Sequence, residues 1–337
     1  PPGARQPLVG YRAVVAAMVA TGFLSFGLWV HHMFATGIPH LGLAVFSIAS
    51  ALIAVPTAVQ IFAWIGTLWK GRPEMHLPML WILGFFVTFV MGGLTGVMVA
   101  MVPFDWQAHD SYFIVAHLHY VLIGGYVFPM IAGIYYWLPV LTGRKRFFRM
   151  GEVAFWLVMA GFHGTFLLLH WAGLLGMRRR IDVVEAGSGW ELINLLASIS
   201  GFVLAIGFGL VILDVAVNAF VAVRGRRNPW NAGTLEWAGE VPDQPWGVRS
   251  VPIISSRYPI WDQPNFIDDI DKGRFYLPDA EEGKRETIVT TVLDAEPVQC
   301  LRVPGPSFVP MIAAGFLGAS FIAATFHWWW WMFGTLF

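Results

Sequence analysis

Seven long apolar stretches constrain this chain more than any other feature of its sequence. They cover residues 11–34, 41–68, 77–102, 112–140, 152–175, 190–223 and 306–333. A helix needs about 20 mostly apolar residues to cross a bilayer, and each stretch reaches that length. Charged residues make up only 12% of the chain, whereas soluble domains contain about 25%. We therefore predict an all-α integral membrane protein, a multi-spanning helix bundle with about seven transmembrane helices.

The stretch between the last two predicted spans is too polar to enter a bilayer. Residues 224–305 are rich in Pro, Asp, Glu and Arg. We therefore predict three regions: residues 1–223 with six spans, an extramembrane polar segment over 224–305, and residues 306–337 with the seventh span.

The charge balance and the cysteine count exclude several kinds of protein. Twenty-one basic and 21 acidic side chains cancel, so nothing in the net charge suggests a nucleic-acid partner. Cys300 is the single cysteine, which excludes an internal disulfide framework and a cysteine-based metal cluster. A metal would have to be bound by His, Asp or Glu.

Basic residues in the short loops predict the orientation of the spans. Alternate loops lie on the same face of the bundle, and we expect the face with the basic residues to be cytoplasmic. These basic residues are Arg5, Lys70, Arg72, Arg144, Lys145, Arg146, Arg149 and the three arginines of residues 224–227. The opposite loops 35–40 and 103–111 contain no Lys or Arg. Arg178, Arg179 and Arg180 break this pattern in the next outer loop, which suggests a local anionic partner.

Two adjacent imidazoles, His31 and His32, end the first predicted span. Neighbours on an α-helix point about 100° apart, so both can reach one metal only if the helix ends or distorts there. Gly37 and Pro39 just downstream permit this. Paired imidazoles suit copper or zinc. The alternative is a pair of interfacial histidines bonded to backbone or lipid headgroups.

Two further histidines, His117 and His119, lie in the fourth predicted span. Positions two apart on an α-helix point about 200° apart, so these side chains should not share a metal. One helix could instead serve two cofactors, one on each face, and hemes with axial His ligands fit that geometry. The alternative is two buried polar residues bonded to other helices.

Two polar clusters lie at the outer face. His109 and Asp110, which follow Asp105, could bind a hard cation such as magnesium, although a helix-capping role for Asp110 is the simpler interpretation. Arg179 and Arg180 are suited to binding carboxylates through paired hydrogen bonds. The alternative for this pair is an ordinary solvated loop.

These clusters occur in a recognisable order along the chain. The segments are Leu28-Trp29-Val30-His31-His32-Met33-Phe34, Val55-Pro56-Thr57, Gly92-Gly93-Leu94-Thr95-Gly96, His109-Asp110-Ser111-Tyr112-Phe113-Ile114-Val115-Ala116-His117-Leu118-His119-Tyr120 and Gly176-Met177-Arg178-Arg179-Arg180. Together they resemble the cytochrome c oxidase subunit I family of heme-copper oxidases. The resemblance runs from about residue 7 to 240 and covers the family's last six helices.

The resemblance implies specific cofactor ligands. His31 and His32 correspond to two ligands of the active-site copper, His117 to the axial ligand of the high-spin heme, and His119 to one axial ligand of the low-spin heme.

It also implies roles for the outer-face clusters. His109 and Asp110 match the family's magnesium site, and Arg179 and Arg180 match its pair of propionate-binding arginines.

Two positions depart from the family pattern. Thr57 matches the threonine of a proton channel, but the lysine expected three residues later is Gln60, which cannot titrate. The aromatic residue expected between the two heme ligands is Leu118, which keeps an apolar spacer.

The remaining ligands of the family precede the first residue of this chain. They are the second axial ligand of the low-spin heme and the third copper histidine with its neighbouring tyrosine. A second proton channel precedes it as well. We therefore expect the chain to begin within a longer protein and to act only when complemented by that N-terminal half. The end of the chain resembles the form in which subunit I continues into a subunit III-like region.

The function implied by the resemblance is that of a respiratory terminal oxidase, which reduces O2 to water with coupled proton movement. Its cofactors would be two a-type hemes (one low-spin, one high-spin), copper and magnesium. The expected partners are subunit II, where electrons arrive, a subunit III-like region, cytochrome c or quinol as donor, and membrane lipid. The expected location is a bacterial plasma membrane rather than the mitochondrial inner membrane.

Other functions remain open at this point. The chain could be a relative of quinol oxidases or nitric oxide reductases, or a non-catalytic truncated fragment. A transporter would need inverted repeats, and none is visible. We interpret the isolated histidines as core or interfacial residues: His40, His76, His163, His170 and His327.

Overall fold

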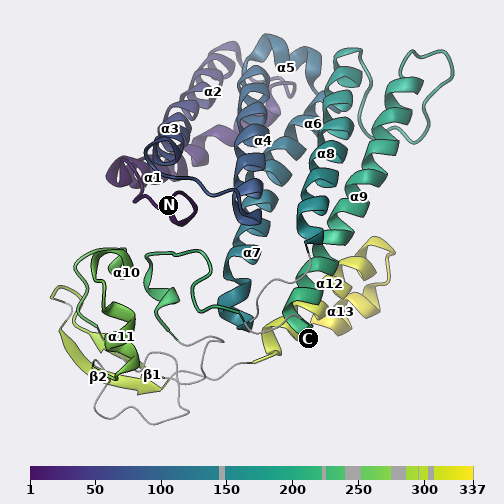
Figure 1. Ribbon diagram of the computed structural model, residues 1–337. Coiled ribbons are helices and arrows are strands. Elements are labelled where there is room, and N and C mark those ends of the chain that lie inside the picture. Colours follow the sequence, from purple (N-terminus) through teal and green to yellow (C-terminus); the bar gives the residue numbers. More distant parts are fainter. Residues whose placement is uncertain are drawn as a thin grey trace. The chain divides into compact units, whose positions relative to one another are not determined.

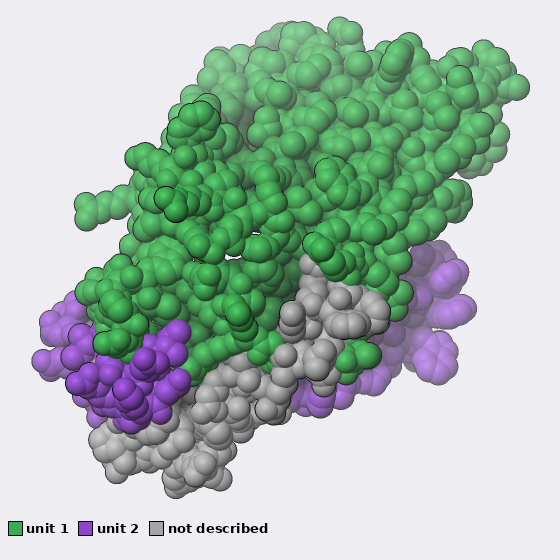
Figure 2. All heavy atoms as spheres, viewed as in Figure 1, with its two compact units in different colours: residues 1–242, 254–266 green, residues 243–253, 267–337 purple. Residues whose placement is uncertain are grey.

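The computed structural model describes residues 1–143, 149–221, 225–239, 252–274, 286–294, 296–302 and 307–336. These residues are mainly helical (Figure 1). The chain divides into two units, which Figure 2 colours separately. One comprises Pro1–Pro242 with Ile254–Phe266, and the other Asp243–Ile253 with Ile267–Phe337. The predicted boundaries at residues 223 and 305 stay a prediction.

Among the described residues, six helical segments are long and apolar enough to cross a membrane, as six of the seven predicted stretches require. The first joins α1 (Tyr11–Leu28) to the 3-10 helix η2 (Trp29–Met33), and the second joins α2 (His40–Leu52) to α3 (Ala54–Lys70). The others are α4 (Leu77–Ala100), then α6 (Tyr112–His119) with the π-helix η3 (Tyr120–Val127) and α7 (Phe128–Thr142), then α8 (Met150–Leu174), and α9 (Glu191–Phe220).

The seventh predicted span differs from the structure. Residues 307–336 form two short helices, α12 (Val309–Thr325) and α13 (Trp329–Leu336), instead of one long helix. The chain reverses at His327, whose backbone is left-handed with φ 57°, and the Ser320 hydroxyl donates to the Met332 carbonyl at 3.2 Å. The apolar pattern alone did not reveal this turn, because both helices are apolar.

Short elements occupy the loops and the polar segment. They are η1 (Pro2–Ala4), α5 (Val102–Ala108), η4 (Leu235–Trp237), α10 (Pro259–Asp262), α11 (Phe266–Asp271), β1 (Glu286–Thr290) and β2 (Pro297–Arg302). β1 and β2 pair antiparallel with a register shift between Val289 and Thr290. Parts of the predicted polar segment, and the basic residues Arg144, Lys145, Arg146 and Arg224, lie outside the described residues.

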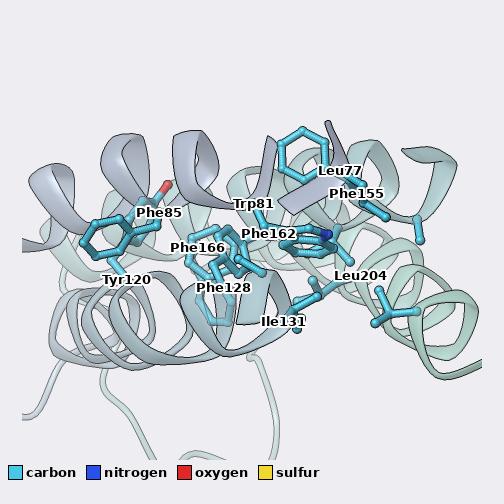
Figure 3. Close-up of a cluster of buried hydrophobic side chains, with 14 of the residues drawn as sticks. Leu77, Trp81, Phe85, Tyr120, Phe128, Ile131, Phe155, Phe162, Phe166 and Leu204 are labelled. Atoms are coloured by element: carbon cyan, nitrogen blue, oxygen red, sulfur yellow. The ribbon is translucent and has the colours of Figure 1, made fainter. Parts of the chain in front are cut away.

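A cluster of buried aromatic side chains holds α4, α7 and α8 together (Figure 3). The Trp81 ring meets Phe128 at 5.3 Å and Phe155 at 5.2 Å, both edge-on. Phe162 completes the group against Phe128 at 5.6 Å. Such pairs contribute about 0.5–1.5 kcal/mol each beyond their buried area. Helices in lipid associate largely through this kind of packing, because lipid tails are as apolar as the side chains.

Glycines let the helices that bear the candidate ligands approach one another closely. A Cβ on Gly92 of α4 would lie 3.1 Å from the Tyr120 backbone, and one on Gly96 would lie 2.9 Å from the His117 ring. A Cβ on Gly173 of α8 would lie 2.0 Å from the Phe113 nitrogen. The Gly-Gly-Leu-Thr-Gly motif thus sets α4 directly against the helix that contains His117.

Candidate functional site

The first candidate site is the pair His31 and His32. The α-helix gives way to the 3-10 helix Trp29–Met33 at this point, which is the distortion that two adjacent histidines need in order to converge. Their Nε2 atoms lie 3.0 Å apart. The Ser50 hydroxyl lies 3.0 Å from His31 Nδ1 and donates its one proton to the Phe46 carbonyl at 2.6 Å. His31 Nδ1 must therefore be the N–H donor, so the lone pair of His31 is on Nε2 and points at His32 Nε2, which lies within hydrogen-bonding distance.

The spacing of the two Nε2 atoms fits one metal ion. Imidazole nitrogens bind zinc at about 2.0–2.1 Å, and two of them at ordinary coordination angles lie about 3 Å apart. No group of three or more His, Cys, Asp or Glu side chains that could hold a metal occurs in the described part of the chain. A metal ion at this pair would therefore have two imidazole ligands from the described residues, and a complete site needs others.

His117 is oriented by helix α4. The Thr95 hydroxyl lies 3.0 Å from His117 Nδ1 and within 3.1 Å of the Met91 and Gly92 carbonyls. Because the hydroxyl proton goes to a carbonyl, its oxygen accepts from His117 Nδ1–H. The Nε2 lone pair is again left available for a ligand. Partners of this kind set the tautomer of metal-binding histidines.

His119 faces a different helix. Its Nδ1 donates to the Val115 carbonyl at 2.7 Å, and its ring stacks on Phe166 of α8 at 4.3 Å. His117 and His119 therefore point toward α4 and α8, as their spacing of two residues predicts. The helix becomes a π-helix immediately afterwards, at Tyr120, and such π segments are frequent at functional sites.

A small polar cavity lies beside the imidazole pair. It has a volume of about 80 Å³, and its lining includes His32, Asp105, His109, Asp110 and Arg179. Asp105 is 1% exposed, and its Oδ2 has no hydrogen-bond partner in the described part of the chain. That oxygen lies 3.3 Å from His109 Nδ1, although the two atoms are not aligned for a hydrogen bond. Burial raises the pKa of the Asp105 carboxyl, and the neighbouring His109 opposes the shift.

Asp110 holds the outer arginine loop in place. The Arg179 Nε donates to Asp110 Oδ1 at 2.6 Å, and the Arg179 backbone N–H donates to the Asp110 carbonyl at 2.9 Å. Slight burial alone would raise the pKa of the Asp110 carboxyl, but the Arg179 guanidinium outweighs it and holds the pKa below its usual value. Asp110 is thus a local anionic partner for the basic cluster, while Arg180 is exposed with φ 66°.

Several residues that position the site were not predicted. Ser50 and Thr95 orient two of the histidines, and only Thr95 had a signal, since it belongs to the glycine-rich motif. The Tyr120 hydroxyl lies 2.7 Å from His163 Nδ1. The His170 ring packs at 4.8 Å against Phe113, and its Nε2 is buried without a partner among the described residues.

Thr57 and Gln60 line a second, larger pocket. It has a volume of about 720 Å³ and lies between α1, α3, α4 and α7. The Thr57 hydroxyl donates to the Ile53 carbonyl at 2.9 Å, which leaves its lone pairs available to the pocket.

The fold and the site together define a class. The described part of the chain contains six helices long and apolar enough to cross a membrane, and two of them bear histidines whose Nδ1 atoms are hydrogen-bonded to the protein, which is what a cofactor-binding integral membrane protein requires. The family model described as "Cytochrome C and Quinol oxidase polypeptide I" matches residues 1–203, more than half of the 337 residues. The chain belongs to this family, and the resemblance drawn from its motifs is confirmed. Membership of a heme-copper oxidase family implies hemes and copper.

Curated relatives agree with this assignment. "Cytochrome c oxidase subunit 1" of Bacillus sp. (strain PS3) is 37% identical over 96% of this chain and 49% of its own length. "Probable cytochrome c oxidase subunit 1-alpha" of Streptomyces avermitilis is 42% identical over 77% of this chain and 45% of its own length. The chain spans about half the length of these relatives. Their bacterial sources and the six apolar helices identify an integral protein of the bacterial plasma membrane.

A solved structure shares the fold. The work titled "Cryo-EM structure of a heme-copper terminal oxidase dimer provides insights into its catalytic mechanism" contains a chain that matches with a TM-score of 0.60 at 20% identity. The match covers 67% of this chain and 45% of that chain. At this identity the likeness concerns the fold alone.

Proposed function

We propose that this chain is the C-terminal half of the catalytic subunit of a cytochrome c oxidase, which reduces O2 to water when the N-terminal half is present. The observation that carries the proposal is the pair of Nε2 atoms on His31 and His32, which lie 3.0 Å apart. The names of the relatives favour the cytochrome c branch of the family over the quinol oxidase and nitric oxide reductase alternatives.

The four imidazoles have distinct proposed roles. His31 and His32 would hold the copper, His117 would hold the iron of a high-spin heme, and His119 would hold the iron of a low-spin heme. Each of His31, His117 and His119 has its Nδ1 hydrogen-bonded to the protein, which supports coordination through Nε2. When bound, a-type hemes and copper would supply the electron transfer and the oxygen chemistry. The protein residues orient these ligands and exclude water.

The outer-face cluster has a second proposed role. His109 and Asp110 would hold magnesium together with waters, since the buried Asp105 oxygen in the same cavity lacks a partner. Arg179 and Arg180 would bind the propionate carboxylates of the hemes. The ion pair with Asp110 fixes Arg179 for this purpose.

Partners and proton movement follow from the proposed reaction. Subunit II would deliver electrons from cytochrome c, with quinol as the other candidate donor, and a subunit III-like region and membrane lipid would complete the assembly. Protons taken up from the inner face would pass Thr57. Moving one elementary charge across the membrane changes its free energy by about 2.3 kcal/mol for each 100 mV of membrane potential.

Ligand substitution in the complete oxidase tests the proposal. His31→Ala and His32→Ala should each remove copper, measured by elemental analysis, and lower O2 consumption at least 100-fold while both heme spectra remain. His119→Ala should instead remove the low-spin heme signal. His40→Ala serves as the matched control, because His40 is exposed on the same outer face. Unchanged copper content in both of the first two variants would contradict the assignment.

A further inference from the structure

Helix α8 and the span that contains His119 contact each other through matched pairs of rings, some of which Figure 3 shows. The pairs, with the distances between their ring centroids, are Phe113 with His170 at 4.8 Å, His119 with Phe166 at 4.3 Å, and Tyr120 with Phe162 at 4.8 Å. The residue number rises along one helix as it falls along the other. The two helices therefore pack antiparallel in one register, and this register places the Phe166 ring over the His119 ring.

A hydrogen bond joins the two helices beside the stacked pair. The Tyr120 hydroxyl lies 2.7 Å from His163 Nδ1. Among the described residues, this is the one side-chain hydrogen bond between α8 and residues 112–127. Tyr120 is 0% exposed, so its hydroxyl has no access to bulk water. His163 precedes Phe166 by three residues, and side chains at that spacing lie on the same face of a helix.

Tyr120 occupies the point at which the helix changes its winding. The α-helix α6 ends at His119, and the π-helix η3 begins at Tyr120. On the opposite side from α8, a Cβ on Gly92 of α4 would lie 3.1 Å from the Tyr120 backbone. The residue is therefore held between two helices, by close backbone packing on one side and by the hydrogen bond to His163 on the other.

We propose that Tyr120 and His163 are positioning residues for His119. Their hydrogen bond fixes the register of α8 against the start of the π-helix, and so holds the His119 ring nearly parallel to Phe166, at 17° between the planes. The Val115 carbonyl sets the tautomer of His119, whereas this bond sets the plane of its ring. The inference rests on the proposed role of His119 as a heme ligand, because ring orientation is one way in which a protein tunes a bound metal.

Substitution of the pair in the complete oxidase complex tests the proposal. Tyr120→Phe keeps the ring and removes the hydroxyl. The low-spin heme should remain, its g-values in electron paramagnetic resonance should shift, and its rate of loss in detergent should rise about fivefold, a typical effect of one hydrogen bond. His163→Ala should produce the same shift, and the double variant should change no further, because both substitutions remove the same bond.

A conservative variant separates positioning from general stability. His163→Asn should restore the wild-type g-values, since an amide can still form a hydrogen bond with the Tyr120 hydroxyl. His163 is half-buried, so its variants decide the question even where Tyr120→Phe does not assemble. Tyr136→Phe is the matched control. It removes a hydroxyl of the same span that accepts from Trp237 Nε1 at 2.9 Å, and it should leave the g-values unchanged.

The outcomes distinguish this inference from the proposed function. Wild-type g-values in both Tyr120→Phe and His163→Ala, or additive effects in the double variant, would overturn the positioning role. A shift in His163→Asn as large as that in His163→Ala would overturn it as well. Absence of a low-spin heme signal from the wild-type complex would instead overturn the proposed role of His119.

Discussion

At the scale of single residues, the site depends on how each imidazole is held. His31, His117 and His119 each have Nδ1 bound by an oxygen, from Ser50, Thr95 and the Val115 carbonyl respectively. The consequence is the same in each case, because the proton is kept on Nδ1 and the lone pair stays on Nε2. Loss of such partners typically weakens metal binding about 10–100-fold.

Thr95→Val should therefore weaken retention of the high-spin heme by about tenfold or more. Valine has nearly the shape of threonine but cannot accept from His117 Nδ1–H. The rate of heme loss and the high-spin absorption band measure the effect. Thr88→Val is the matched control, since the Thr88 hydroxyl of the same helix donates to the Gly84 carbonyl. Equal heme retention in the two variants would show that Thr95 does not orient His117.

At the scale of elements, two helices change their winding where the candidate ligands lie. The first span tightens into a 3-10 helix at Trp29–Met33, and the fourth widens into a π-helix at Tyr120–Val127. Glycines on both sides let the π-helix pack closely against α4. A Cβ on Gly92 of α4 would lie 3.1 Å from the Tyr120 backbone, and a Cβ on Gly124 of η3 would lie 2.4 Å from the Thr88 hydroxyl oxygen. The π-helix and this close packing thus depend on each other.

Gly173→Ala should destabilise the bundle. A Cβ at Gly173 would lie 2.0 Å from the Phe113 nitrogen, so α8 and α6 must separate, at a cost of about 1–3 kcal/mol. Thermal unfolding in detergent, followed together with heme release, measures this. Gly209→Ala in α9 has nothing within 4 Å and should be neutral or stabilising, because alanine favours helix by about 1 kcal/mol. Similar unfolding temperatures for both variants would contradict the close approach.

At the scale of the whole molecule, the six spanning helices alternate in direction. Their outer loops lie at the end of the bundle that contains α5 (Figure 1), and the candidate ligands His31, His32 and His109 lie toward that end. The pair Glu74 and His76 lies in the loop at the opposite end, between α3 and α4. The candidate ligands and the basic loop that contains Lys70 and Arg72 therefore lie at opposite ends of the bundle.

Topology reporters test this arrangement in living cells. Alkaline phosphatase is active only outside the cytoplasm, so fusions after Gly37, Gln107 and Gly187 should be active. Fusions after Arg72 and Gly143 should be inactive, because basic loops stay on the cytoplasmic side. A fusion of green fluorescent protein at each of the five positions is the control and should show the reverse pattern. Activity after Arg72 would contradict the predicted orientation.

The sequence by itself determined the membrane class and six spans, and it predicted which histidines are candidate ligands. Spans follow from runs of apolar residues, because the bilayer requires about 20 of them whatever the neighbours are. The divergence of His117 and His119 follows from helix periodicity alone. The chain reversal at His327 was beyond such reasoning, since no change in hydropathy marks it.

Only the tertiary structure determined the hydrogen bonds that orient the candidate ligands. Ser50 is 19 residues from His31, Thr95 is 22 residues from His117, and Arg179 is 69 residues from Asp110. Contacts at such separations depend on which helices pack together, and no local pattern encodes that. The burial of Asp105 has the same origin, whereas the convergence of the two Nε2 atoms follows from the local 3-10 winding at Trp29–Met33. Local chemistry thus selects the residues, and helix packing determines the direction in which each lone pair points.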